Sequence, residues 1–313
     1  MTPILKLNYP RLVTDAVKLS YNDPLTGGSP DIELTVIDRG IVPIAPGATL
    51  DVEIGRVGTP YRLRAGLFEV DRVTRQEDGL RAIAATGLPL SDPQLKLKRD
   101  ADYAEFTLVE ILEEVATRYS LSVFSRDLPD IEFSQLAQNN QSDLDFLNGL
   151  ATRLGAVFKI ENRQLIFTLL LDLEMRSPLF SVKSSKLISY TETILGVENY
   201  QYLDYEVVLF GDIEAIRVED ERVTNGAIIA YRGAGVTADD ENLLIIAARE
   251  QLRQINSANH IFTIDIPGDF NLIAGSTFTI DNKPAFIDRV VHSIDTADRK
   301  DWRASLNCRY LPR

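Results

Sequence analysis

The sequence of 313 residues has little of what redox and metal chemistry require: one cysteine, Cys308, and two histidines, His260 and His292. A single cysteine excludes an internal disulfide and a zinc site built only from cysteines. The two histidines and the cysteine are scattered without metal-ligand spacing. We therefore expect a protein made in a cytoplasm, with no redox crosslink, no metal and no cofactor.

Long hydrophobic runs are also missing. The most apolar stretch, Leu165–Leu171, is far shorter than the roughly 20 residues that cross a bilayer. The N-terminus shows no basic segment followed by an apolar core, so no signal peptide is expected. These absences predict a protein without membrane anchoring.

Motifs for nucleophilic or nucleotide chemistry are incomplete. No phosphate-binding loop occurs, Gly233–Gly235 lacks the third glycine of a dinucleotide fingerprint, and Gly275–Thr277 lacks the second glycine of a hydrolase elbow. His260 lies at the entry of an apolar strand and His292 inside one, so each is interpreted as a packing or rim residue. We expect no enzymatic activity.

Acidic residues are in excess, with 46 acidic and 33 basic residues and a net charge of −13. Residues 1–100 carry 13 of each sign, so the whole excess lies in residues 101–313, which hold 20 basic and 33 acidic residues. An acidic surface repels phosphate backbones and anionic membranes, which argues against specific nucleic-acid binding. The alternative is that the excess only maintains solubility.

The densest acidic segment is the one place where paired carboxylates could support glycoside hydrolysis. It alternates acidic with apolar residues, which is typical of the solvent face of a strand, and the chain has one tryptophan to line a sugar cleft. A solvated face is therefore favoured over a catalytic pair. The segment contains Glu206, Asp212, Glu214, Glu219, Asp220 and Glu221.

The first hundred residues alternate apolar and polar side chains, as in Ile32–Ile37 and Leu50–Ile54, with Gly/Pro turns between the runs. This period of two predicts a small antiparallel barrel. The period then changes: Thr107 and Glu110 have capping-box spacing before a helical stripe, which predicts a helix over 107–119. A second helix is predicted from Ser142 to Gly155, followed by a hairpin over 156–169.

From about residue 178 the strand pattern returns, interrupted by a helix predicted over 240–255 that opens after Thr237, with Asp240 at capping-box spacing. We expect a mainly β (α+β) protein with two small antiparallel β-barrel domains and an inserted α/β domain. Residues 1–99 with 178–197 would form the first barrel, 100–177 the inserted domain, and 198–313 the second barrel.

One segment resembles a known family. Residues 138–158, followed by Gln164–Phe167, resemble a recurring segment of tail baseplate hub proteins: the late control D protein of P2-like phages, the T4 hub, and the N-terminal part of type VI spikes. Phe286–Asp295 resembles the penultimate strand of the family. The order barrel, insert, barrel fits the family over nearly the whole chain. The residues that carry the resemblance are Gln138, Ser142, Asp143, Leu144, Phe146, Leu147, Leu150, Ala151, Gly155, Ala156 and Phe158.

The resemblance implies a structural, ring-forming protein of the virion tail, assembled in the bacterial host cytoplasm as a homotrimer. Its ring would join a hexameric tail tube to a trimeric central spike. The chain ends at Arg313 without the OB domain and needle of fused type VI spikes, so a separate spike protein is expected. The tube or its initiator, the tape-measure protein and a LysM-like baseplate protein are the other implied partners. The family supplies no catalytic residues.

Two alternatives stay open: a carboxylate-dependent peptidoglycan hydrolase associated with a tail, and a β-barrel module for a small ligand. For the hub we also hypothesise that the acidic segment Glu206–Glu221 lines the ring's channel, where carboxylates would keep DNA from binding. The alternative for these side chains is an outer rim.

Overall fold

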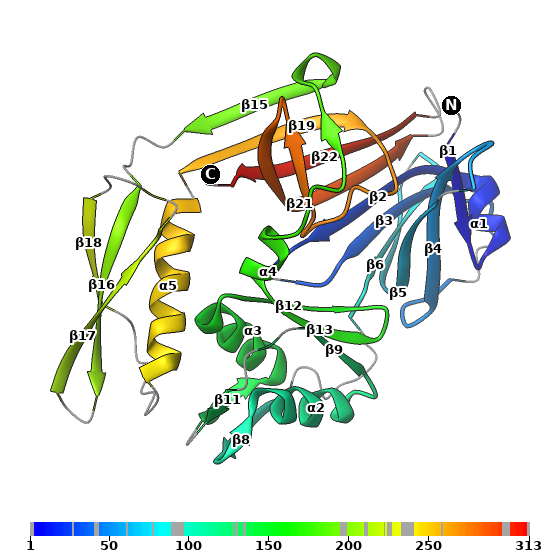
Figure 1. Ribbon diagram of the computed structural model, residues 1–313. Coiled ribbons are helices and arrows are strands. Elements are labelled where there is room, and N and C mark those ends of the chain that lie inside the picture. The colour runs from blue at the N-terminus through cyan, green and yellow to red at the C-terminus, as the bar shows by residue number, and fades with distance from the viewer. Residues whose placement is uncertain are drawn as a thin grey trace.

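In a computed structural model the chain is mainly β, with most strands in one large antiparallel sheet (Figure 1). The structure describes residues 3–26, 28–40, 44–60, 62–76, 78–88, 97–126, 128, 131–133, 136–194, 199–209, 212–221, 223, 227–232, 241–257, 259–295 and 301–311.

The N-terminal part contributes six strands in the order β1-β4-β5-β6-β3-β2. Inward-facing residues such as Leu34, Val52 and Ile83 are fully buried, while their neighbours in sequence face solvent. The period of two predicted from sequence is therefore confirmed here. The elements are β1 (Pro3–Leu7), α1 (Pro10–Asp15), β2 (Ala16–Pro24), β3 (Asp31–Ile37), β4 (Thr49–Arg56), β5 (Arg62–Arg75) and β6 (Leu80–Thr86).

The C-terminal strands continue the same sheet. β21 pairs antiparallel with β2, from Lys18 opposite Asp295 to Pro24 opposite Arg289, and on its other side with β22. The path then runs through β19 to β15, with β20 and β14 branching from β21. The elements are β14 (Ser181–Val182), a 3₁₀ turn (Ser184–Lys186), β15 (Ser189–Ile194), β19 (His260–Pro267), β20 (Thr277–Ile280), β21 (Lys283–Asp295) and β22 (Asp301–Tyr310).

This arrangement corrects two expectations. The strands expected in two separate barrels lie in one 12-stranded sheet, ten of them along the path from β1 to β15, and no pairing among the described strands closes this sheet. Residues 178–197 do not complete a barrel with 1–99, because β14 pairs with β20 and β15 pairs with β19. The reason is packing: Phe180 stacks on Phe278, with ring centroids 5.1 Å apart, and Val182 and Leu187 join the same C-terminal core.

An α/β lobe lies between the two halves of the sheet in sequence. Helices α2 and α3 pack on a three-stranded sheet, β12-β13-β9, and share one core with it (Figure 1). The elements are β7 (Lys98–Tyr103), β8 (Phe106–Thr107), α2 (Leu108–Arg118), β9 (Ser122–Arg126), β10 (Glu132–Phe133), β11 (Leu136–Ser142), α3 (Asp143–Leu154), β12 (Ala156–Glu161), β13 (Gln164–Leu169) and α4 (Leu170–Glu174).

The helix ends of the lobe confirm the capping signals. The Thr107 hydroxyl accepts a hydrogen bond from the Glu110 N–H (3.3 Å), and the Glu110 carboxylate accepts one from the Thr107 N–H (2.8 Å). Ser142 caps α3, and Gly155 ends it in the left-handed region with φ of 63°. These capping residues determine where α2 and α3 begin and where α3 ends.

The last unit is a small sheet, β17-β16-β18, against which α5 packs (Figure 1). Its inward residues Leu203, Val218 and Leu252 belong to the same core as α2 and α3. The described residues between 199 and 257 therefore pack with the lobe, whereas the sequence pattern had assigned them to the second barrel. The helix predicted over 240–255 is confirmed, whereas its proposed cap at Thr237 and Asp240 lies outside the described residues. The elements are β16 (Tyr200–Leu209), β17 (Asp212–Glu219), β18 (Ala227–Arg232) and α5 (Glu241–Ser257).

Gly155 gives the first test. A Cβ built there would lie 2.3 Å from the Glu250 side chain, and the residue has a positive φ, so Gly155→Ala should destabilise the protein by about 1–3 kcal/mol. Gly149, within α3, has nothing within 4 Å of such a Cβ, so Gly149→Ala should stabilise by about 1 kcal/mol. Urea unfolding measures both. Equal effects of the two substitutions would contradict the assigned role of Gly155.

Candidate functional site

The residues that carry the family resemblance lie together in the lobe. The apolar members form the buried stripe of α3 and the start of β12, with Leu144 partly buried. Ser142 and Gly155 are the caps of α3. The two remaining polar members, Gln138 and Asp143, are both fully buried, so they cannot be surface recognition groups in this chain.

Asp143 is the centre of a buried polar cluster. Its carboxylate accepts hydrogen bonds from Tyr119 Oη at 2.7 Å, Gln138 Nε2 at 2.8 Å and Arg118 Nη1 at 3.1 Å. Arg99 Nε lies 3.3 Å from the same carboxylate. These partners come from β7, α2 and β11, so one carboxylate at the start of α3 connects the main elements of the lobe.

The surroundings of Asp143 favour its ionised form. Burial alone would raise the pKa of Asp143, but hydrogen bonds from Tyr119 and Gln138 and the charge of Arg118 outweigh it and lower the pKa below 3.8. Because the pKa of Asp143 is lower in the folded than in the unfolded chain, its ionisation stabilises the fold at pH values above the unfolded pKa. This contribution is lost as the pH falls through the folded pKa. The cluster is a structural device rather than a proton donor at neutral pH.

Asp143→Asn should therefore be strongly destabilising. Losing the charge leaves Arg118 and Arg99 without their buried counter-ion, and breaking a buried ion pair typically costs about 3–5 kcal/mol. Glu113→Gln removes a charge from an exposed position on the neighbouring helix and should change stability by no more than about 0.5 kcal/mol. Chemical unfolding of both variants checks this, and similar small losses in both would show that Asp143 does not organise the lobe.

The structure separates the acidic residues proposed for the channel. Glu219 is exposed on β17 and accepts a hydrogen bond from Gln201 Nε2 (3.0 Å), and Glu221 is exposed just after it. Glu206 on β16 is half-buried. Asp220 is 7% exposed and accepts a hydrogen bond from Asn256 Nδ2 (3.0 Å), so it ties β17 to α5 and cannot line a channel. The side chains of Asp212 and Glu214 lie outside the described residues.

A second buried ionic cluster joins the three parts of the molecule, and sequence reasoning missed it. Glu174, at the end of α4, accepts hydrogen bonds from Arg253 Nη1 of α5 (2.5 Å) and Arg309 Nη2 of β22 (2.6 Å). Arg253 also binds Glu250, and all four side chains are at most 10% exposed. One carboxylate therefore links the lobe, the β16–β18 unit and the large sheet.

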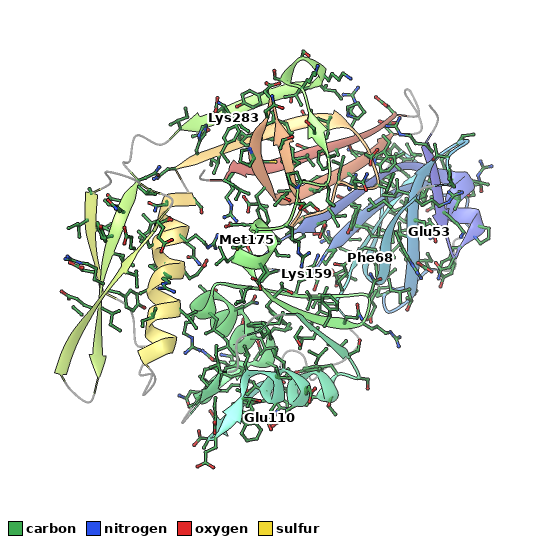
Figure 2. The ribbon with its side chains drawn as sticks, in the orientation of Figure 1. Glu53, Phe68, Glu110, Lys159, Met175 and Lys283 are labelled. Atoms are coloured by element: carbon green, nitrogen blue, oxygen red, sulfur yellow. The ribbon has the colours of Figure 1, made fainter. Side chains whose placement is uncertain are left out.

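The lobe also meets the large sheet along a groove of about 310 Å³, whose walls include Phe124, Leu179 and Ile273. Lys159 on β12 lies 3.2 Å from the Asp23 carboxylate on β2 and 2.7 Å from Glu161. Figure 2 places Lys159 and Met175 in this junction. The ion pair between Lys159 and Asp23 fixes the lobe against the N-terminal strands.

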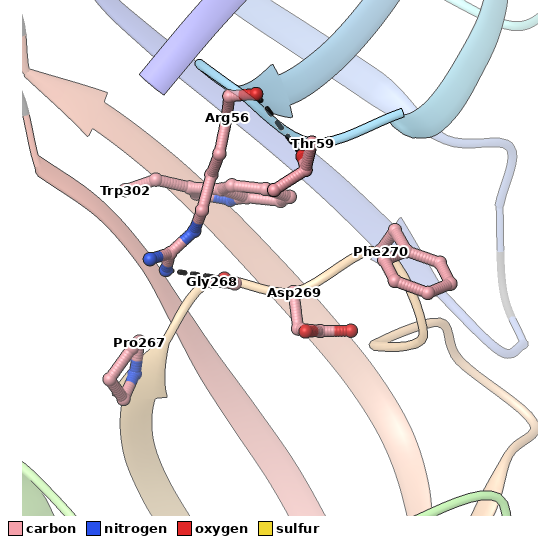
Figure 3. A pocket seen from close by; sticks show the side chains of 7 residues that line it. All are labelled: Arg56, Thr59, Pro267, Gly268, Asp269, Phe270 and Trp302. Atoms are coloured by element: carbon pink, nitrogen blue, oxygen red, sulfur yellow. Dashed lines mark hydrogen bonds between the residues drawn. The ribbon is translucent and has the colours of Figure 1, made fainter. Parts of the chain in front are cut away.

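A cavity of about 460 Å³ lies where the end of β4 meets residues 267–270 and Trp302 of β22 (Figure 3). Arg56 of β4 donates from Nη2 to the Gly268 carbonyl (2.7 Å), and its guanidinium carbon lies 5.6 Å from the centre of the Trp302 ring. A Cβ at Gly268 would lie 2.3 Å from Trp302. The Arg56 guanidinium is thus engaged by groups of the protein itself, through the cation–π contact and the hydrogen bond. We therefore interpret Arg56 and Trp302 as a structural contact between β4 and β22.

Trp302 in turn fixes His292 as a neutral imidazole. The indole N–H of Trp302 donates to Nδ1 of His292 (3.1 Å), and the Nε2–H of His292 donates to the Leu272 carbonyl (2.8 Å). Burial lowers the pKa of His292 to about 4. The interpretation of His292 as a packing residue agrees with these contacts.

His292 predicts a pH dependence. Between pH 6.5 and about 4 the unfolded chain binds a proton at this position and the folded chain does not, so the stabilising contribution is present above pH 6.5 and lost as the pH falls. The shift corresponds to about 3 kcal/mol. Urea unfolding across this range should show that loss in the wild type and in His260→Gln, and a smaller loss in His292→Gln. If the stability of His292→Gln falls with pH as steeply as that of the wild type, His292 is not the source of the pH dependence.

Within the described ranges, no group of three or more His, Cys, Asp or Glu side chains could hold a metal ion. No helix in those ranges is long and apolar enough to span a membrane.

Comparison with known proteins gives no matching family model and no matching curated protein. Solved structures do match. A tail protein from Neisseria meningitidis MC58 superposes with a TM-score of 0.73 at 10% identity, over 99% of this chain and 97% of that one. The 43 kDa tail protein of prophage MuSo2 from Shewanella oneidensis gives 0.69 at 14% identity, over 100% and 99%.

The chain has the baseplate hub fold of phage tail proteins. The E. coli c3393 protein, a type VI secretion component described as similar to the T4 tail proteins gp27 and gp5, also has this fold, with a TM-score of 0.61 at 13% identity over 99% of this chain and 76% of that one. The resemblance inferred from residues 138–158 is thus confirmed as a likeness of fold. These neighbours are described as tail proteins and as a type VI secretion component.

Proposed function

We propose that this protein is a structural baseplate hub subunit of a phage or phage-like tail. It forms a homotrimeric ring that joins a hexameric tail tube to a separate trimeric spike. The observation that supports this most is the extent of the fold match: two tail proteins align over at least 99% of this chain and 97% of their own length. A match of that extent covers the lobe and both halves of the sheet, not one common motif.

The internal ionic clusters support a mechanical role. A hub transmits force between tube and spike, so its parts must keep their relative positions. Glu174 and the Lys159–Asp23 pair lock the lobe, the β16–β18 unit and the sheet together. Buried, hydrogen-bonded charges are costly to break, which favours a rigid ring segment over a hinged one.

The location and partners follow from the same proposal. The protein would reside in the virion tail, with the spike on one side of the ring and the tube on the other. A chain of the Francisella PdpA–VgrG complex shares the fold with a TM-score of 0.54, and this protein spans 57% of that longer chain. The comparison supports the placement of this fold in an assembly that includes a VgrG chain.

The channel hypothesis is now narrower. Glu219 and Glu221 are exposed on one edge of the β16–β18 unit and, with Glu206, are the acidic side chains we propose to face the channel. Carboxylates there would repel DNA phosphates. A structure of the assembled ring tests this hypothesis. If these carboxylates lie on the inner wall, the hypothesis is supported; if they lie on the outer rim, it is wrong, although the hub proposal still holds.

Assembly is the direct test of the hub role. Light scattering of the purified protein at micromolar concentration should give the mass of three chains for the protein alone, or the mass of three chains plus the bound spike when a candidate spike protein is added. A monomer in both conditions would contradict the proposal.

A further inference from the structure

The three-stranded sheet of the lobe, β12-β13-β9, has its two faces in different surroundings. The buried apolar residues of these strands point to one face and share a core with α2 and α3. The residues that alternate with them point to the other face. Lys159, Ile166 and Phe124 form one row across that second face, because Lys159 lies opposite Ile166 and Ile166 opposite Phe124.

The cover of this second face ends before it reaches β9. On β12 the Lys159 side chain is 12% exposed, and on β13 Ile166 is partly buried. On β9 the exposed fraction of Phe124 rises to 45%. The face is therefore packed against the large sheet at one side and left open, with an aromatic ring in water, at the other.

Two more exposed apolar side chains lie across from Phe124. Leu179, in the segment that follows α4, is 58% exposed, and Ile273, in the loop between β19 and β20, is 41% exposed. All three line the groove of about 310 Å³ between the lobe and the sheet. Single exposed apolar residues are ordinary, whereas three that converge on one groove from separate parts of the chain mark an interaction site.

The groove also has a cation that is not paired within the described part of the chain. Of the three charged residues that line it, Lys159 already lies 3.2 Å from the Asp23 carboxylate and 2.7 Å from that of Glu161. Asp23 also accepts a hydrogen bond from the Ala274 N–H (2.9 Å). Arg176 is exposed, and no described carboxylate forms an ion pair with it. A free guanidinium beside an apolar groove fits an occupant that carries a carboxylate.

The size and the polar groups of the groove narrow the occupant further. Its volume lies at the low end of the roughly 300–1,000 Å³ of ligand clefts, which suits a few side chains. Contact between two folded subunits buries about 800 Å² on each, far more than such a groove offers. The hydroxyl side chains of Ser177 and Ser276 also line it. Hydroxyls beside apolar side chains suit a peptide backbone better than a hydrocarbon chain.

We propose that this groove binds an extended segment of another protein that carries apolar side chains and one carboxylate. The apolar side chains pack against Phe124, Leu179 and Ile273, and the carboxylate pairs with Arg176. The inference goes beyond the hub function and does not depend on it, since it follows from the groove within a single chain.

Saturation-transfer NMR with synthetic peptides tests the groove on the whole protein. Acetyl-Asp-Leu-Thr-Leu-amide and acetyl-Leu-Thr-Leu-Asp-amide present the same groups in both directions along the groove. At least one of them should receive saturation at its leucine methyl groups. The matching peptides with lysine in place of aspartate should bind at least about fivefold more weakly, because attraction to Arg176 becomes repulsion.

Three variants with exposed side chains locate the binding. Arg176→Glu should reverse the preference, so that the lysine peptide binds more tightly than the aspartate peptide. Phe124→Ser should weaken the binding of the aspartate peptide about tenfold, because an apolar contact is lost. Ile37→Ser, at a 40% exposed isoleucine on β3 that does not line the groove, should leave the binding unchanged. Circular dichroism and melting curves confirm that each variant is folded.

The outcomes separate the groove from the hub role. If neither aspartate peptide binds at concentrations up to about 1 mM, or if Arg176→Glu leaves the preference unchanged, the proposed occupant is wrong. If Phe124→Ser lowers the mass of an assembled wild type in light scattering, the groove is a contact between copies and the proposal is also wrong. A wild type that stays monomeric contradicts the hub proposal and leaves the peptide result standing.

Discussion

The pairing of β2 with β21 is the constraint on which the rest of the structure depends. Seven residue pairs, from Lys18 opposite Asp295 to Pro24 opposite Arg289, join strands that lie some 270 residues apart. This pairing makes one sheet from both ends of the chain, and Arg56, Trp302 and His292 close the contact beside it. The α/β lobe and the β16–β18 unit, which lie between these two strands in sequence, leave the sheet, and the chain returns to it afterwards.

The buried charges follow from that topology. Because the α/β lobe and the β16–β18 unit lie beside the sheet, their positions depend on contacts that the sheet itself does not provide. Glu174 supplies one by binding Arg253 and Arg309 at once, and Asp23 supplies another by binding Lys159. Such clusters specify orientation more than they add stability, since burying charges has a large desolvation cost. A fixed orientation is what a subunit of a force-bearing ring requires.

Local features of the fold were predictable from sequence, and long-range ones were not. The caps at Thr107, Ser142 and Gly155 and the helical stripes located α2 and α3, because these signals act within a few residues. The pairing of β15 with β19 and the sharing of one sheet by the strands of both predicted barrels were not predictable, because a period of two identifies a strand but not its neighbour.

The ionic residues show the same limit. Glu174 and Arg309 are typical surface types, and nothing local marks them as buried. For Asp143, the one available signal was its position among the residues that resemble hub proteins, directly after the cap of α3. Asp220 was misinterpreted as a solvent-facing residue because strand alternation ends just before it, where its backbone N–H bonds to Gln201 O and its carboxylate to Asn256.

The central claim is that this fold serves as a ring subunit. Electron cryomicroscopy of the assembled protein, viewed along the particle axis, tests it most directly. The account predicts a closed ring of three chains around an open channel, with each chain contributing both halves of its sheet to the ring. Isolated single chains, or a closed twofold dimer without a channel, would contradict it.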